Sequence, residues 1–215
     1  IMRAYMVNDK VHVVELGAKD IVIPSHQYPL NGKLKVFTRD NTEPCKDEQI
    51  KVIFDSVKYE IGKCYGNTRR LLDALEANEI PKSRYKSYVG WLFIGDTMPV
   101  HHAYTVIDGK HLLDFSPMHE LYSMEISGEL STPEMKEAMV DKFMDKIRQP
   151  NSIRSIFGKA DPELLYVGSE CTPDKGIKIY QKLMKAFPKH PCLRTTSTGM
   201  TEMQNLIMER LKDGI

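Results

Sequence analysis

The sequence lacks long hydrophobic runs. No stretch approaches the roughly 18–20 consecutive apolar residues that a membrane-spanning helix requires. Residues 1–16 also lack the apolar centre and the small-residue cleavage site of a signal peptide. We therefore expect a protein with no membrane partner.

An excess of charge of one sign is lacking as well. Thirty Lys and Arg residues face 29 Asp and Glu residues, which gives a net charge of +1. Such a balance argues against a strongly electrostatic partner, so we expect no nucleic-acid partner. With 41% hydrophobic and 27% charged residues, the composition is that of an ordinary globular protein.

Cysteine is scarce and widely spaced. The four cysteines, at positions 45, 64, 171 and 192, form neither a disulfide framework nor a CxxC pair of the kind that binds zinc. This pattern predicts reduced thiols and a cytoplasmic setting. Linkers rich in Pro, Gly or Ser, internal repeats and low-complexity tracts are absent too, which favours a single domain over 1–215.

Hydrophobic periodicity predicts an α+β fold. Short alternating or β-branched runs predict strands over 11–16, 21–23, 33–37, 85–94, 100–107 and 110–115, and a short strand over 164–167. A period near 3.6 predicts a helix from Thr42-Glu43-Pro44 to Ile61 and a second one from Cys64 to about Asn78. Further helices are expected to begin at Pro133, at Pro173 and near Thr201. We expect a core over 44–118 and a helical C-terminal part over 130–215.

Cys64 stands at the predicted start of a helix. The thiolate is the reactive form of cysteine, and the unpaired N–H groups of a helix start favour an anion. An imidazole that accepts the proton, and a carboxylate that orients the imidazole, would complete an activated nucleophile. A lone cysteine is more often a small buried hydrophobic residue, so these two partners decide between the interpretations.

Two adjacent histidines compete for the role of base. On a strand, His101 and His102 point to opposite faces, so only one of them can meet Cys64. Asp114 lies between Leu113 and Phe115 in a predicted strand, where an aspartate is disfavoured unless it has a partner.

The loop between the strands 100–107 and 110–115 decides which histidine faces Asp114. A two-residue Asp108-Gly109 turn, which local sequence favours, would place Asp114 on the face of His101. A three-residue loop over 107–109 would place Asp114 directly opposite His102 instead. The catalytic interpretation requires the second register, so we predict the three-residue loop, with a positive φ at Gly109.

These motifs resemble a known superfamily. Cys64-Tyr65-Gly66-Asn67, Tyr88-Val89-Gly90-Trp91, His102-Ala103-Tyr104 and Leu113-Asp114 resemble the transglutaminase-like and papain-like cysteine hydrolases. The order also resembles arylamine N-acetyltransferases, which share that core, although the Arg-Gly-Gly-x-Cys signature of those enzymes is absent. Tyr104 stands where transglutaminase-like cores usually have Trp. The resemblance covers about 51 of the 215 residues, from 64 to 114.

The resemblance implies a papain/transglutaminase-like core, in which a helix bearing the cysteine packs on a small antiparallel sheet. It implies Cys64 as nucleophile, His102 as base and acid, and Asp114 as the orienting carboxylate. The reaction would be acyl transfer through a thioester, ending in hydrolysis of a peptide or amide bond or in transfer to an amine, with no metal or organic cofactor.

The oxyanion of this reaction would need two hydrogen-bond donors. The backbone N–H of Cys64 is one candidate, and Gln49, Tyr59 and Asn67 are candidates for the other, although Asn67 could serve only as a cap or in packing. Trp91 is a candidate substrate contact.

Two alternatives come from other classes. The fold could serve as a non-catalytic binding module, in which Cys64, His102 and Asp114 are merely packed. A metal site built from Cys64, Asp114 and one or two of His101, His102 and His111 is the weaker alternative, because adjacent strand histidines cannot both face one ion. The reactivity of the Cys64 thiol discriminates among the three interpretations.

Overall fold

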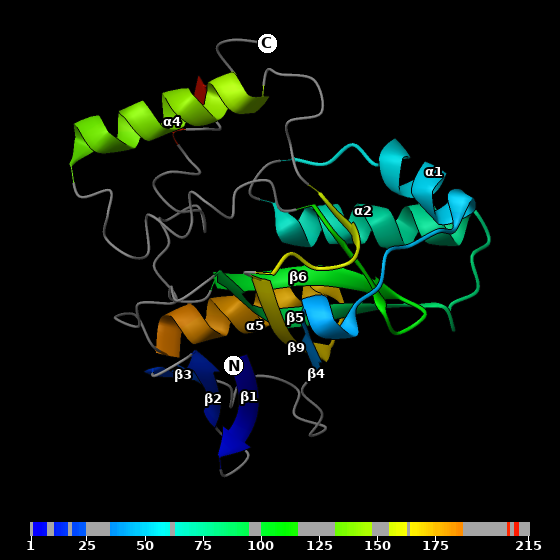
Figure 1. Cartoon of the computed structure of the whole chain (residues 1–215), viewed down its shortest axis with the longest axis horizontal. Coiled ribbons are helices and arrows are strands. Elements are labelled where there is room, and N and C mark those ends of the chain that lie inside the picture. Colours follow the sequence, from blue (N-terminus) through cyan, green and yellow to red (C-terminus); the bar gives the residue numbers. More distant parts are fainter. Residues whose placement is uncertain are drawn as a thin grey trace.

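The computed structural model describes residues 2–7, 11–16, 19–24, 35–60, 63–94, 100–115, 132–147, 155–162, 164–186, 206 and 209–210. It has a mixed α+β architecture built on antiparallel sheets (Figure 1). A three-stranded sheet consists of β1 (Met2–Val7), β2 (Val11–Leu16) and β3 (Lys19–Pro24). The predictions for 11–16 and 21–23 are therefore confirmed.

A six-stranded antiparallel sheet carries the stretch of interest. Its order is β4-β9-β5-β6-β7-β8, and its strands are β4 (Lys35–Phe37), β5 (Tyr85–Ile94), β6 (Val100–Ile107), β7 (His111–Asp114), β8 (Ile156–Gly158) and β9 (Leu164–Glu170). The strands β5, β6 and β7 match the predictions for 85–94, 100–107 and 110–115, and each pairs antiparallel with the next.

The sheet also draws on residues outside the predicted core of 44–118. Strand β4 precedes that range, and β8 and β9 come from the part that we expected to be helical. Strand β9 lies between β4 and β5, and every described side chain from Leu164 to Ser169 is buried. A strand that is covered on both faces has no polar alternation, which is why its pattern predicted only a short strand at 164–167.

The helices agree with the periodic pattern, with one correction. Helix α1 (Glu48–Ser56) begins later than predicted because Asp47 caps it, accepting a hydrogen bond from the Ile50 N–H at 3.1 Å, and it ends before Val57, which is extended. Helix α2 (Cys64–Ala77) begins at Cys64, and Asn78 ends it.

The later helices also follow the sequence. Helices α4 (Pro133–Ile147) and α5 (Pro173–Ala186) begin at the predicted prolines. Of the segment expected to be helical near Thr201, only residues 206 and 209–210 lie within the described residues, and they are helical.

The two faces of the large sheet bury different sets of side chains. Helices α1 and α2 lie side by side, and α2 packs along β6 (Figure 1). This side of the sheet buries one apolar cluster, formed by Ile50, Ile53, Phe54, Leu71, Leu75, Ile80, Ile107, Leu113 and Phe115. The opposite face buries a second cluster that is rich in tyrosine, formed by Phe37, Tyr88, Leu92, Tyr104, Val106, Leu112, Ile156, Ala160, Leu164 and Tyr166. Because adjacent residues of a strand point to opposite faces, His101 and His102 lie on different faces of this sheet.

The loop between β6 and β7 combines both of the expected geometries. Asp108 and Gly109 both have positive φ, 50° and 73°, and the Lys110 N–H donates to the Ile107 carbonyl, as in a two-residue turn. However, Ile107 pairs with His111, so Lys110 is an extra residue in the loop. The loop therefore spans three residues, 108–110, and not 107–109 as predicted, while the positive φ at Gly109 is confirmed.

The extra residue sets the face of Asp114. Continuing the pairing of Thr105 with Leu113 by one residue places Asp114 opposite Tyr104, on the same face as His102. The prediction that His102 lies directly opposite Asp114 is wrong, because the residue opposite Asp114 is Tyr104, two positions further along β6. The prediction that His102 and Asp114 lie on the same face is correct.

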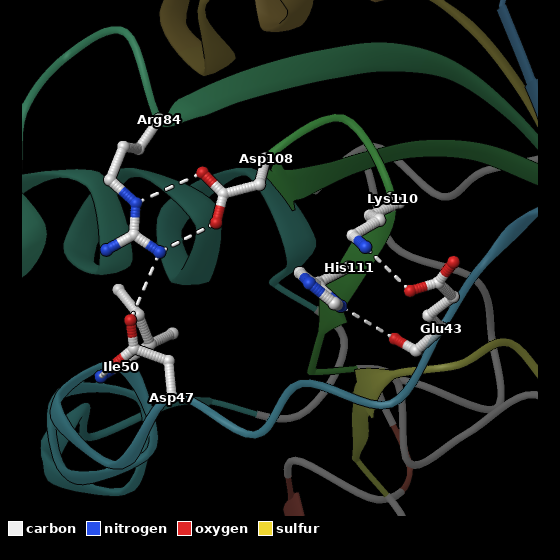
Figure 2. A network of polar contacts seen from close by, with 7 residues as sticks. All are labelled: Glu43, Asp47, Ile50, Arg84, Asp108, Lys110 and His111. Atoms are coloured by element: carbon white, nitrogen blue, oxygen red, sulfur yellow. Dashed lines mark hydrogen bonds and ion pairs between the residues drawn. The ribbon is translucent and has the colours of Figure 1, made fainter.

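Polar contacts hold this loop from both sides (Figure 2). The Arg84 guanidinium donates to both Asp108 carboxylate oxygens, at 3.0 and 2.6 Å, and to the capping residue Asp47 at 3.1 Å. On the other side, the Lys110 carbonyl accepts from the Glu43 N–H at 3.0 Å, and the Lys110 ammonium pairs with the Glu43 carboxylate at 2.7 Å. The bulged loop is thereby tied to the start of β5 and to the segment before α1.

Arg84→Ala should destabilise the fold by about 1–2 kcal/mol, because it removes a two-pronged, charge-assisted contact that is only partly exposed. Lys82→Ala is a matched control, since Lys82 pairs with Glu76 at 2.8 Å but its side chain is 76% exposed. Urea denaturation of both variants measures the difference. Equal losses in the two variants would contradict a special role of Arg84 in holding the loop.

Candidate active site

Cys64 is the first residue of α2, and its side chain is half-buried. Among the described residues, no side chain caps this end of the helix: the residue before it, Lys63, makes no capping hydrogen bond. The first N–H groups of α2 and the positive end of its dipole are therefore directed towards the region in front of the thiol. This surrounding favours an anion at or near Cys64.

His102 and Asp114 form a buried pair. The His102 Nε2 lies 2.9 Å from each oxygen of the Asp114 carboxylate, and the two side chains are only 5% and 2% exposed. The contact is diagonal across β6 and β7, which fits the register set by Lys110. Because Nε2 is used by Asp114, the Nδ1 atom is the ring nitrogen left for another partner.

The Cys64 thiol is a second partner of the same imidazole. Strand β7 pairs with β6 only over Thr105–Ile107, so His102 lies beyond the paired stretch, and there Cys64 makes a side-chain hydrogen bond with it. Burial alone would lower the pKa of His102, but the charges of Asp114 and Cys64 and their hydrogen bonds raise it to about 10. The structure thus brings together the three residues that the sequence singled out.

His101 occupies the other face of β6. It contacts the Tyr65 hydroxyl, stacks on Tyr180 with ring centroids 4.8 Å apart, and meets Trp91 edge-on at 5.0 Å. Burial, together with the nearby charge of His102, lowers the pKa of His101 to about 3. At neutral pH the two adjacent histidines therefore differ in protonation: His102 is protonated and His101 is neutral.

Tyrosines line the interior around the His102–Asp114 pair, and the sequence did not single out Tyr166 among them. The Tyr166 hydroxyl donates to Asp114 Oδ2 at 2.7 Å. Tyr104, on the same strand face as His102, packs between the rings of His102 and Tyr88. The one available signal for Tyr166 was a tyrosine inside an apolar run, because a buried phenol hydroxyl needs a partner.

The further candidates lie as follows. The Asn67 side chain is 1% exposed and engages the Glu60 peptide twice, accepting from its N–H at 2.8 Å and donating to its carbonyl at 2.7 Å. It therefore braces the segment before α2. Gln49 is exposed in the first turn of α1, Tyr59 stacks on Phe115, and Trp91 is buried on the face of His101. The arrangement assigns none of Gln49, Tyr59 and Asn67 the role of second oxyanion donor. Trp91 is 1% exposed, and its role as a substrate contact stays a prediction.

Neither a metal centre nor a membrane segment is found in the part of the chain that the structure describes. There, no three or more His, Cys, Asp and Glu side chains are grouped so that they could hold a metal ion. The metal alternative thus finds no ligand set among these residues. None of the described helices is long and apolar enough to cross a membrane.

The two histidines predict opposite dependences of stability on pH. In Cys64→Ala, which has no thiol proton to transfer to the imidazole, the Asp114 charge still raises the pKa of His102, so above about pH 6.5 the folded protein keeps a proton that the unfolded chain releases and the free energy of unfolding should fall as pH rises. The slope for one proton is about 1.4 kcal/mol per pH unit. For His101 the contribution is present above pH 6.5 and is lost as pH falls towards 3, because only the unfolded chain takes up the proton.

Urea denaturation from pH 4.5 to 8.5, with Cys64→Ala as the common background, should therefore give a maximum of stability near pH 6.5. His102→Gln should flatten the alkaline side of the curve, and His101→Phe should flatten the acid side. A stability of Cys64→Ala that stays constant from pH 6.5 to 8.5 would contradict a raised pKa of His102.

Comparison with known proteins yields no relative for this chain: no protein-family model, no curated protein and no solved structure matches it. The functional argument therefore depends on the geometry of Cys64, His102 and Asp114.

Proposed function

We propose that this protein is a cysteine-dependent acyl-transfer enzyme that hydrolyses a peptide or amide bond through a thioester, with Cys64, His102 and Asp114 as its triad. The observation that carries the proposal is the buried His102–Asp114 pair, with Nε2 at 2.9 Å from both carboxylate oxygens and the Cys64 thiol hydrogen-bonded to the same imidazole. A half-exposed thiol at the start of a helix is accessible to a substrate carbonyl, whereas a merely packed cysteine needs no such partners.

The chemistry follows from the charge states. Because the pKa of His102 is raised, its imidazole carries a proton that it can donate, and in the proposed mechanism the Cys64 sulfur reacts as the thiolate, the nucleophilic form of cysteine. The sulfur attacks the carbonyl carbon and forms a C–S bond, and the carbonyl oxygen becomes an oxyanion to which the Cys64 N–H can donate. His102 then gives its proton to the nitrogen of the leaving amine as the C–N bond breaks, which leaves a thioester on Cys64.

Hydrolysis completes the cycle. His102, now neutral, takes a proton from water, the resulting hydroxide attacks the thioester carbon, and the C–S bond breaks to release a carboxylic acid and the thiolate. An amine in place of water would give transfer instead of hydrolysis. Asp114 keeps the imidazole in one orientation and stabilises the imidazolium in both half-reactions.

The proposal includes the core of the transglutaminase-like and papain-like cysteine hydrolases. It is supported by the order of the elements, since α2 begins with the cysteine and the antiparallel neighbours β6 and β7 carry the histidine and the aspartate. We further propose a cytoplasmic setting and a peptide or protein substrate. The three described cysteines, Cys45, Cys64 and Cys171, are all free thiols, as a reducing compartment would keep them.

The thiols provide a test that needs no substrate. Iodoacetamide at pH 6, followed by peptide mapping, should modify Cys64 at least tenfold faster than Cys45 and Cys171, because burial raises the pKa of both of those thiols. His102→Ala should slow the modification of Cys64 and leave that of Cys45 unchanged. Equal rates of modification at the three thiols would contradict the proposal and would favour a Cys64 that is only packed.

Turnover of a substrate identified from an acyl or peptide library gives a second test. Cys64→Ala should abolish the activity with little loss of stability, because a nucleophile at a helix start contributes more to reactivity than to packing. His102→Ala should slow the reaction by roughly 10²–10⁴-fold, as expected for loss of a general acid and base, and His101→Ala by much less. Activity that survives in Cys64→Ala would remove the nucleophile from this assignment, and equal effects of the two histidine variants would remove His102.

A further inference from the structure

We propose that Tyr166 is a positioning residue of this site, whose hydroxyl holds the Asp114 carboxylate in the orientation that binds His102. The inference rests on the proposed function, because it adds Tyr166 as a support for the triad of Cys64, His102 and Asp114. Tyr166 is no catalytic residue in this proposal: it touches Asp114 and acts on His102 only through that carboxylate.

The contact joins strands that are not neighbours. Tyr166 lies on β9 and Asp114 on β7, and both β5 and β6 lie between them in the sheet. The 2.7 Å hydrogen bond therefore does not come from strand pairing but crosses the interior of the tyrosine-rich face. Both side chains are buried, at 0% and 3% exposure, and the Tyr166 ring also lies against His102 with centroids 6.0 Å apart.

A second donor on Asp114 has a defined geometric effect. The carboxylate can rotate about its Cβ–Cγ bond, and His102 Nε2 contacts both oxygens at 2.9 Å only in one rotational position. A hydroxyl that donates to Oδ2 from a fixed ring fixes that position, and donors to an anion make the stronger hydrogen bonds. Because the ring of Tyr166 is packed in the core, its hydroxyl is a rigid support and not a mobile one.

The chain offers a closely matched control. Tyr104 belongs to the same cluster, is likewise 0% exposed, and meets Tyr166 edge-on with centroids 4.8 Å apart. Among the described residues its hydroxyl has no hydrogen-bond partner. Tyr166→Phe and Tyr104→Phe thus remove the same buried atom, but only the first removes a hydrogen bond to Asp114.

Two measurements on the full chain test the proposal, after thermal unfolding has verified that both variants fold. The first is the rate of modification of Cys64 by iodoacetamide at pH 6, which should fall roughly tenfold in Tyr166→Phe, because a misplaced imidazole is less often against the thiol. In Tyr104→Phe the rate should stay within about twofold of wild type.

The second measurement is an NMR titration of the His102 ring, assigned with His102→Gln. The pKa of His102 should fall by at least about half a unit in Tyr166→Phe, since a carboxylate that turns away stabilises the imidazolium less. Tyr104→Phe should leave it in place. If Tyr166 had only a structural role, Tyr166→Phe would lower the stability but would change neither the modification rate of Cys64 nor the pKa of His102 relative to Tyr104→Phe.

The outcomes separate this inference from the proposed function. Identical rates and titrations in the two variants, or a rise of the His102 pKa in Tyr166→Phe, would overturn the positioning role. Should wild-type Cys64 react no faster than Cys45 and Cys171, the proposed function fails, and the titration alone then decides the role of Tyr166, because it requires no reactive thiol.

Discussion

The extra residue at Lys110 is the constraint on which the candidate site depends. In an antiparallel pair, a shift of one residue moves every side chain of a strand to the other face. Without Lys110 in the loop, Asp114 would share a face with His101, which is surrounded by Tyr65, Trp91 and Tyr180 and held neutral. With it, Asp114 meets His102. The ion pairs of Arg84 with Asp108 and of Lys110 with Glu43 stabilise the loop in which this choice is made.

Burying a charged imidazolium raises the free energy of the folded state, and the groups around His102 offset this increase. Burial lowers the pKa of His101 to about 3, and His102 on the next position is just as deeply buried. Both histidines lie among aromatic rings, and what separates them is that the Asp114 carboxylate and the Cys64 sulfur raise the pKa of His102. The buried charges of His102 and Asp114 are tolerated because each is hydrogen-bonded, and the Tyr166 hydroxyl adds a donor that the carboxylate would otherwise lack.

The sequence predicted the local features of the fold well and its long-range contacts poorly. The start of α2 at Cys64 and its end at Asn78 follow from the apolar period, and the strands β5 to β7 follow from alternation and turn residues. The position of the bulge did not follow, because it depends on contacts of Lys110 with Glu43, a residue in another part of the chain. Tyr166 was missed for a similar reason: its strand is buried on both faces, and its partner lies three strands away.

The same comparison indicates why a short motif is informative here although most short motifs are not. Cysteine, histidine and aspartate each have a common structural role, and no one of them predicts chemistry. The joint requirement is stricter. A helix must begin at Cys64, and β6 and β7 must pair in the register that places Asp114 on the face of His102 and not on that of His101. The chain meets the second condition by departing from the two-residue turn that Asp108-Gly109 favours locally. The locally less favoured loop length is what brings Asp114 to the face of His102, so the local turn preference and the longer-range contacts of the loop disagree here, and the longer-range contacts decide the register.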